Sequence, residues 1–291
     1  MENETQNLSN TEATLYFSNQ SLKLSGFDLK LSRFEKSIMI GNRRFKKKEY
    51  DDGIKRLEKE KLSPDEIRKK TLKRAKNKVI DLMLSNAWHW KKRNGKAYLP
   101  IFITFTFRDN VTELDYANKE FTKFIRRLSY NIRGKISFLK YLAVIEFQER
   151  SAIHYHVVFF NLPWIDRICD KMRDEWRKCV GEGSARVESV KSVKGMIGYL
   201  TKYLTKSSND DRLLARKSYF PSRGLKQPIR CSSEEVINLV RPILPDKAQY
   251  DFYEYENEFL KRTEIYCYNL RKYPKVYKKI KEEILKNIIT E

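Results

Sequence analysis

The sequence contains few cysteines and histidines, and it lacks long apolar runs. Its four cysteines lie far apart and form no CxxC pair, which argues against a zinc cluster and against the disulfide framework of a small secreted domain. No apolar run reaches the length of about 18 residues that a membrane helix needs, and residues 1–25 do not resemble a signal peptide. No P-loop motif (GxxxxGKS or GxxxxGKT) occurs, which excludes a fused P-loop helicase. We therefore expect a soluble protein of the cytoplasm, without a membrane partner.

Positive charge is what the sequence has in excess. Sixty Lys and Arg residues stand against 38 Asp and Glu residues, which gives a formal net charge of +22 over 291 residues. A polyanionic partner is the simplest reason for such an excess, although charge alone does not separate DNA, RNA and an anionic membrane. Hydrophobic residues make up 41% of the chain and aromatic residues 13%, which is enough to bury a sizeable core.

The order of the predicted elements indicates an α+β fold. Strand-like and helical patterns alternate from about residue 98 onward. This order, β-α-β-β-α-β-α, is that of a ferredoxin-like or RRM-like domain with a central antiparallel sheet, which we expect to be covered on one face. The strands are expected at 99–107, 141–148, 153–160 and 185–190, and the helices at 113–133, 164–180 and 192–206.

The remaining segments are expected to be mostly helical extensions of this domain. We divide the chain into a basic N-terminal extension (1–95), a central domain (96–228) and a C-terminal extension (229–291). Residues 1–25 are expected to form a loose lead-in, and the N-terminal extension to be largely helical after about residue 45. Ser-Pro-Asp-Glu at 63–66 opens a basic amphipathic helix. Residues 232–291 are rich in Tyr and Lys and are expected to be mostly helical.

Two of the three histidines form the pattern His154-Tyr-His156 inside an apolar strand. Because side chains alternate along a strand, both imidazoles face the same side of the sheet, as metal chelation requires. A divalent ion that polarises phosphate normally also takes an oxygen ligand. If the hairpin turns about Arg150, Glu146 pairs with His154 and becomes the preferred third ligand. Gln148 is the second choice, because a one-residue slip would reverse the faces.

A duplicated stretch, YLTKYLTK, spans residues 199–206. Positions four apart share one face of a helix, so Tyr199 and Tyr203 point the same way, and Lys202 and Lys206 place cations near that side. A phenol with a pKa near 10 is a poor nucleophile at neutral pH unless a lysine or a metal-bound phosphate favours the phenolate. Tyrosines at this spacing more often simply pack. Their occurrence beside a His-x-His strand in so basic a chain favours a catalytic role.

These motifs resemble those of the HUH endonucleases, specifically the rolling-circle replication initiator (Rep) proteins of small phages and plasmids. The histidine motif precedes the tyrosine motif, as in Rep proteins, whereas conjugative relaxases have the tyrosine first. The paired tyrosines resemble the two-tyrosine subgroup. The resemblance covers about residues 98–225. It rests on FITFTF (102–107), on Glu146 with IHYHVVFF (153–160), and on GYLTKYLTK (198–206).

The resemblance implies that residues 96–228 form an HUH endonuclease domain. Mg²⁺ or Mn²⁺ would polarise the scissile phosphate, and a tyrosine would form a 5′-phosphotyrosine link and release a 3′-hydroxyl for priming. Tyr203 would make the first nick and Tyr199 the second transfer, while Lys202 and Lys206 neutralise phosphate or phenolate. The implied metal ligands are His154, His156 and Glu146, with Gln148 as the alternative to Glu146.

The substrate implied by the resemblance is single-stranded or extruded origin DNA in a bacterial or archaeal cell. Basic residues and aromatic stacking would hold it. A separate helicase and polymerase of the host would unwind and copy the DNA. The candidate DNA-binding residues are Lys73, Arg74 and Lys76 of the basic helix, and Arg223 and Lys226 of SRGLKQP (222–228).

Three other functions remain open from the sequence. A non-catalytic RRM-like module would stack bases on sheet aromatics such as Tyr155, Phe159 and Phe160, and its binding would not depend on metal. An HUH transposase or mobilisation nickase would use the same chemistry for another purpose. A phosphodiesterase that uses water as the nucleophile would form no covalent adduct.

Overall fold

The chain forms two compact units, which are described separately. The central unit comprises residues 25–27 and 62–228, and the terminal unit comprises residues 1–24, 28–61 and 229–291. The central unit thus begins upstream of residue 96, where we expected the central domain to start. The computed structural model describes residues 16–40, 63–163, 168–188, 192–213, 216–257 and 260–290.

The central unit is built on a five-stranded sheet of order β6-β3-β5-β4-β7, in which every paired strand runs antiparallel. Helix α2 (Leu114–Arg133) joins β3 to β4, and helix α3 (Ile168–Val180) lies between β5 and β6. The resulting order β-α-β-β-α-β confirms the predicted α+β, ferredoxin-like fold class. The strands are β3 (Ile101–Phe107), β4 (Tyr141–Phe147), β5 (Ile153–Phe159), β6 (Gly183–Val187) and β7 (Tyr219–Pro221).

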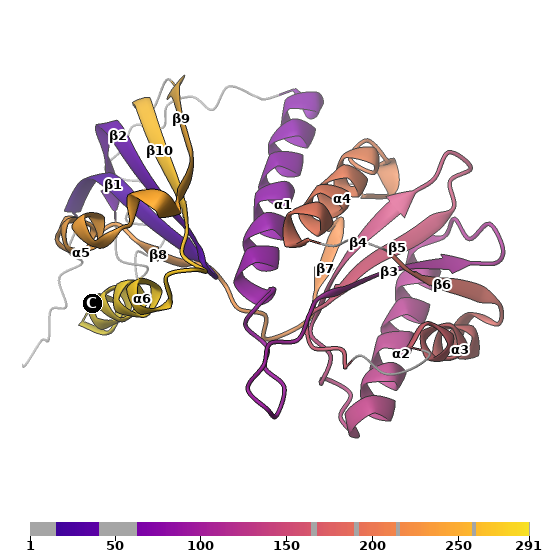
Figure 1. Cartoon of the computed structure of the whole chain (residues 1–291). Coiled ribbons are helices and arrows are strands. Elements are labelled where there is room, and N and C mark those ends of the chain that lie inside the picture. Colours follow the sequence, from indigo (N-terminus) through magenta and orange to yellow (C-terminus); the bar gives the residue numbers. More distant parts are fainter. Residues whose placement is uncertain are drawn as a thin grey trace, which may run out of the picture. The chain divides into compact units, whose positions relative to one another are not determined.

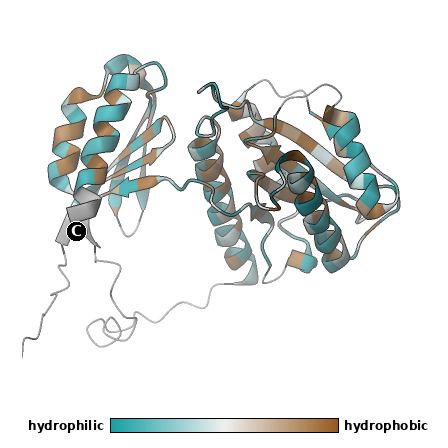
Figure 2. Cartoon of the chain, turned by 90° about the horizontal axis from the view of Figure 1, so that it is seen from below, coloured by the Kyte–Doolittle hydropathy of each residue, from teal (hydrophilic) through white to brown (hydrophobic). Residues whose placement is uncertain are grey.

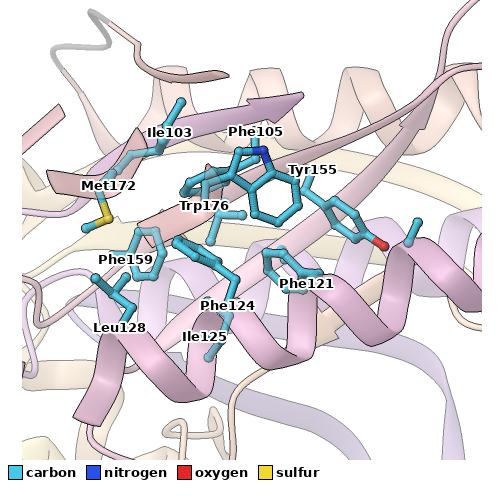
Figure 3. Close-up of a cluster of buried hydrophobic side chains, with 14 of the residues drawn as sticks. Ile103, Phe105, Phe121, Phe124, Ile125, Leu128, Tyr155, Phe159, Met172 and Trp176 are labelled. Atoms are coloured by element: carbon cyan, nitrogen blue, oxygen red, sulfur yellow. The ribbon is translucent and has the colours of Figure 1, made fainter. Parts of the chain in front are cut away.

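Helices cover both faces of this sheet (Figure 1), which corrects our expectation of one covered face. Every residue of β5 is buried, because both its odd and its even positions are mostly apolar. On one face, Phe105 and Tyr155 pack against α2 and α3, where Phe124 and Trp176 complete an aromatic cluster (Figure 3). Each such aromatic pair contributes about 0.5–1.5 kcal/mol beyond the area that it buries.

Helices α1 (Pro64–Asn86) and α4 (Val193–Lys206) pack on the other face through a second apolar cluster. Helix α1 begins as predicted, with a capping box in which the Ser63 hydroxyl and the Glu66 carboxylate exchange hydrogen bonds with each other's backbone N–H groups. It alternates hydrophilic and hydrophobic residues (Figure 2) and buries Val79 and Leu82 completely. The helix is therefore an integral layer of the central unit rather than an extension.

The terminal unit is a second five-stranded antiparallel sheet, of order β8-β1-β2-β10-β9. Helices α5 (Glu234–Val240) and α6 (Pro274–Thr290) cover one of its faces (Figure 1), where they pack on Leu29, Leu31 and their neighbours. The strands are β1 (Tyr16–Ser25), β2 (Asp28–Ile40), β8 (Ile229–Cys231), β9 (Gln249–Asn257) and β10 (Lys261–Asn269). Three short 3-10 turns lie at Asp211–Leu213, Arg241–Ile243 and Asp246–Ala248.

These strands correct two expectations from the sequence. Residues 16–25 of the expected loose lead-in are a strand, and the expected helices of 232–291 are limited to α5 and α6. The physical reason is that residues 249–269 are rich in tyrosine, which suits a pleated, half-buried surface. The expected helical content of residues 45–62 and the predicted helix start at 164 lie outside the described residues. Within the ranges that the structure describes, no helix has the length and apolar character needed to cross a membrane.

Candidate active site

The predicted hairpin of β4 and β5 has the predicted register, with Glu146 paired to His154 across the two strands. Even-numbered side chains of both strands face α1 and α4, as shown by the packing of Val144 and Val158 in the cluster beneath these helices. Toward the hairpin turn the same face becomes polar, because it carries Glu146, His154 and His156. The end of this face is therefore the only place on β5 where the strand presents imidazoles toward α4.

Glu146 lies at the centre of this polar group. Its carboxylate accepts hydrogen bonds from His156 Nε2 at 2.8 Å and from Lys206 Nζ at 2.9 Å. Burial alone would raise the pKa of Glu146, but these two bonds and the positive charges behind them lower it to about 2. The carboxylate is therefore ionised throughout the physiological pH range, as a metal ligand must be.

His156 is held by a second chain of hydrogen bonds on its other nitrogen. The Thr104 hydroxyl lies 3.0 Å from His156 Nδ1 and donates to Glu188 Oε1 at 2.9 Å. Because that hydroxyl proton is directed to Glu188, its oxygen accepts from Nδ1–H of His156. In the neutral ring the lone pair is then on Nε2, facing Glu146, and only a proton or a metal ion reconciles that lone pair with a carboxylate.

His154 is buried but has a different environment. Its Nδ1 lies 3.1 Å from Gln148 Nε2, so the structure pairs Gln148, our second-choice ligand, with the first histidine and Glu146 with the second. Burial is the main cause that lowers the pKa of His154 to about 4. His154 is thus a neutral imidazole at physiological pH, the form that binds a metal ion.

Helix α4 brings Tyr203 directly onto the histidine pair. The phenol ring of Tyr203 stacks on the His156 ring with centroids 3.5 Å apart and an interplanar angle of 2°. Tyr199, one turn earlier, lies 6.4 Å from Tyr203 and 6.0 Å from Phe102, and it is 45% exposed. Both tyrosines are therefore on the side of α4 that meets the site, as the spacing predicted.

The end of α4 is fixed to β4 by a serine that sequence analysis did not single out. Ser207 is fully buried, and its hydroxyl donates to Ile145 O at 3.0 Å and accepts from Phe147 N at 3.2 Å. These bonds bracket Glu146 on β4. They fix the position of the helix end, and with it Lys206 and Tyr203, relative to the carboxylate.

The two lysines of the duplicated motif occupy different positions. Lys206 pairs with Glu146, which raises the pKa of the lysine, and its Nζ lies 5.9 Å from the centre of the Tyr203 ring. Lys202 is exposed on the helix. Burial, followed by the charges of Glu146 and Glu188, raises the pKa of Tyr203. A nucleophilic phenolate at Tyr203 therefore needs added positive charge in the site.

The donor set around Glu146 fits a hard divalent cation. Two imidazole nitrogens and a carboxylate oxygen share one buried face, and the Nε2 of His156 confronts a carboxylate that stays ionised. Across the described parts of the chain, however, no three His, Cys, Asp or Glu side chains converge closely enough to form a metal cluster. Metal binding by His154, His156 and Glu146 stays a prediction.

The candidate DNA-binding residues lie on two neighbouring segments of the central unit. Lys73 and Arg74 are exposed on α1, and Lys76 is half-buried there. Arg223 and Lys226 are exposed in the segment after β7. This segment is attached to the end of α1, because the amide of Asn86 bonds to both backbone groups of Lys226, at 2.9 and 3.0 Å.

The base-stacking role that an RRM-like module would give to the central sheet is contradicted. Tyr155, Phe159 and Phe160 are fully buried. Tyr155 stacks on Phe121 of α2 at 4.3 Å, inside the core. These aromatic residues are therefore closed to bases, because helices cover both faces of the sheet.

Thr104 and Glu188, like Ser207, were not predicted as site residues. A signal for Thr104 was present, since Thr104 and Thr106 are the polar positions of the strand FITFTF. Glu188 follows β6 and reaches the site only because β6 pairs with β3, placing Arg186 opposite Thr104. That pairing joins segments about eighty residues apart, which local patterns do not specify.

Part of the central unit matches a known protein family. Residues 100–208 match the model of a family described as a replication-associated protein of the ORF2 type. The matched stretch runs from β3 to the end of α4 and so includes both histidines and both tyrosines. No curated protein and no solved structure matches the chain significantly. The family match supports a Rep-type domain with a role in the initiation of DNA replication, and it implies binding to DNA at an origin.

Proposed function

We propose that the chain is a strand-specific DNA nicking and joining enzyme of the HUH type that initiates and terminates rolling-circle replication. The observation that carries this proposal is the stacking of Tyr203 on His156, with Glu146 bonded to both His156 and Lys206. A candidate nucleophile, two imidazoles, a carboxylate and an ammonium group meet at one end of the sheet. The family match over residues 100–208 supports the same function.

The proposed nucleophile is the phenol oxygen of Tyr203. It forms a bond to the scissile phosphorus while the bond between phosphorus and the 3′ oxygen breaks. The leaving oxygen takes up a proton and becomes a 3′-hydroxyl that primes synthesis, and the 5′-phosphate stays bound to Tyr203. Because one phosphate diester replaces another, the bond energy is retained for later rejoining.

The proposed cation site consists of His154, His156 and Glu146, with Gln148 as the alternative to Glu146. Mg²⁺ or Mn²⁺ bound there would supply positive charge that polarises the scissile phosphate and favours the phenolate. This need for positive charge agrees with the raised pKa of Tyr203, which burial and the nearby carboxylates cause.

The residues around the site orient these groups. Thr104 and Glu188 hold the His156 ring in the tautomer that directs its Nε2 lone pair toward Glu146. Lys206 lies beside both Glu146 and the Tyr203 ring, where its charge stabilises a phosphate or phenolate oxygen. Ser207 holds the end of α4 against β4.

Tyr199 is the proposed nucleophile of the second transfer. It lies one helical turn from Tyr203 on the same side of α4, and it is accessible. After one round of replication it would cut the regenerated origin, and the released 3′-hydroxyl would attack the Tyr203 phosphodiester to close the displaced circle. Exposed Lys202 would neutralise phosphate near Tyr199.

A covalent-adduct assay tests this function. End-labelled single-stranded DNA from the gene's own replicon is incubated with the full-length protein and Mn²⁺, and the products are separated on a denaturing gel. We expect a metal-dependent, protein-sized labelled band for the wild type, a much weaker band for Tyr203→Phe, and none for Tyr203→Phe combined with Tyr199→Phe. The phenylalanine variants keep the ring that stacks on His156 and lose only the hydroxyl.

The same gel separates the alternatives. Cleavage without any adduct would point to water as the nucleophile and would contradict the proposal. Tight DNA binding without cleavage or adduct in DNA that contains the origin would favour a non-catalytic binding protein.

A further inference from the structure

The sheet of the terminal unit has one face that its helices leave uncovered. Alternation along the strands assigns the side chains to faces, since Leu29 and Leu31 pack under α5 and α6 whereas Lys30 points the other way. Among the residues that the structure describes, neither helix of this unit lies on the face that carries Lys30. We call this the open face; besides Lys30 it includes Phe34, Tyr253, Tyr255, Ile265 and Thr263.

Aromatic rings lie exposed on the open face. Tyr253 is 39% exposed and Tyr255 is 45% exposed, although a tyrosine at the core of a stable sheet is normally covered. They stand two residues apart on the edge strand β9, so their rings line the same face. Half-buried Phe34 lies two strands away in register with Tyr255, because Thr263 pairs with both.

A lysine accompanies these rings. Lys30 Nζ donates to the Tyr253 hydroxyl at 3.3 Å and lies 5.6 Å from the centre of its ring. Lys23 and Arg230 pair across β1 and β8 on the same face, because their neighbours Leu22 and Leu24 point to the helices. The strand charges of the open face are basic at Lys23, Lys30, Lys36 and Arg230, and acidic at Asp28 and Asp251.

The opposite face has the reverse charge. Beyond the apolar contacts with α5 and α6 it carries carboxylates, and Arg262 binds two of them, Glu254 at 2.8 Å and Glu264 at 3.3 Å. The backbone N–H of Arg262 also donates to Glu35. Charges of opposite sign are thus segregated between the faces, and the basic face is the one with the exposed rings.

We propose that the open face binds single-stranded DNA. Unpaired bases stack on exposed aromatic rings, while lysine and arginine neutralise the phosphates between them. A duplex keeps its bases stacked inside and has no use for the rings, so the arrangement favours a single strand. The choice of DNA over RNA rests on the proposed replication function; the stacking surface itself rests on the geometry of the terminal unit. The face would hold a displaced strand away from the nicking site.

A photocrosslinking experiment on the full-length wild-type protein tests the contact without any substitution. A strand with 5-iododeoxyuridine in place of thymidine is bound and irradiated, and the crosslinked tryptic peptide is identified by mass spectrometry. We expect crosslinks in the peptide 248–261, which contains Tyr253 and Tyr255. Crosslinks confined to peptides of the central unit would overturn the proposal.

Binding measurements with matched variants provide the second test. The variant Tyr253→Ala with Tyr255→Ala removes both rings, whereas Phe252→Leu, on the helix-covered face of the same strand, is the control. In fluorescence anisotropy with labelled oligo(dT) we expect at least a tenfold loss of affinity for the double variant, from about 1–3 kcal/mol per stacked base, and little change for the control. Equal loss in both, or none in the double variant, would overturn the proposal.

Further measurements separate this proposal from the nicking function and from other ligands. Lys30→Glu is a second variant that keeps both rings; it should weaken binding and reduce its salt dependence. Adduct formation at saturating DNA should be unchanged in all these variants, so an inactive wild type with an intact oligo(dT) effect would defeat only the nicking proposal. Competition by duplex DNA or oligo(rU) as strong as that by oligo(dT) would contradict a single-stranded DNA site.

Discussion

Replacing Glu146 by Gln perturbs the buried carboxylate that links the histidines to α4. Glutamine has the shape of a protonated glutamate and removes only the negative charge. In the wild type this charge accepts hydrogen bonds from His156 and Lys206 at 2.8 and 2.9 Å. The variant therefore isolates the electrostatic contribution of the carboxylate from its packing.

The magnitude follows from the pKa of Glu146, which the fold lowers from 4.5 to about 2. At about 1.4 kcal/mol per pKa unit, the ionised form stabilises the folded state by at most about 3.4 kcal/mol. Because the side chain of Lys206 is 52% exposed, solvent screens part of this, and we expect about 2 kcal/mol. Since the pKa is lowered on folding, the contribution is complete above about pH 5 and is lost as the pH falls toward 2.

Urea unfolding of wild type and Glu146→Gln at pH 7, 5 and 3, in the presence of a metal chelator, measures this effect. The wild type should be more stable by about 2 kcal/mol at pH 7, and the difference should fall to less than half by pH 3, where the wild-type carboxylate begins to protonate. Equal stability at pH 7, or a difference that does not change down to pH 3, would refute the electrostatic account of this residue.

Three further predictions concern metal and DNA. Thr104→Val should leave the fold intact but lower Mn²⁺ affinity about tenfold, measured by calorimetry, because the His156 ring loses its partner; unchanged affinity would remove Thr104 from the site. His154→Ala with His156→Ala should abolish Mn²⁺-dependent adduct formation and keep salt-sensitive DNA binding, and loss of the circular dichroism spectrum would count against this. Lys73→Gln with Arg74→Gln should reduce the slope of log affinity against log salt by about 1–2, and an unchanged slope would place DNA elsewhere.

The hairpin and the tyrosine helix were predictable because their signals are local. Alternation put His154 and His156 on one face, and the short link around Arg150 set the register that pairs Glu146 with His154. Helical periodicity put Tyr199 and Tyr203 on one side of α4. In each case the spacing within one short segment determines which side chains lie together.

The partners of these segments were not predictable from local patterns. The stacking of Tyr203 on His156 depends on how α4 packs, and the role of Glu188 depends on the pairing of β6 with β3. The terminal sheet joins the two ends of the chain, as in the bond between Lys30 and Tyr253, which are 223 residues apart. A strand pattern shows that a segment pairs but not with which other strand.

The central claim is most directly tested by locating the covalent link on the chain. Trypsin cleaves after Lys202, so Tyr199 falls in the peptide 195–202 and Tyr203 in the peptide 203–206. The protein is incubated with origin DNA and Mn²⁺, digested with nuclease and trypsin, and analysed by mass spectrometry. The account predicts a nucleotide phosphate on the peptide 203–206 after the first nick. A nicked product with no modified tyrosine, or with the phosphate on a residue outside these two peptides, would contradict it.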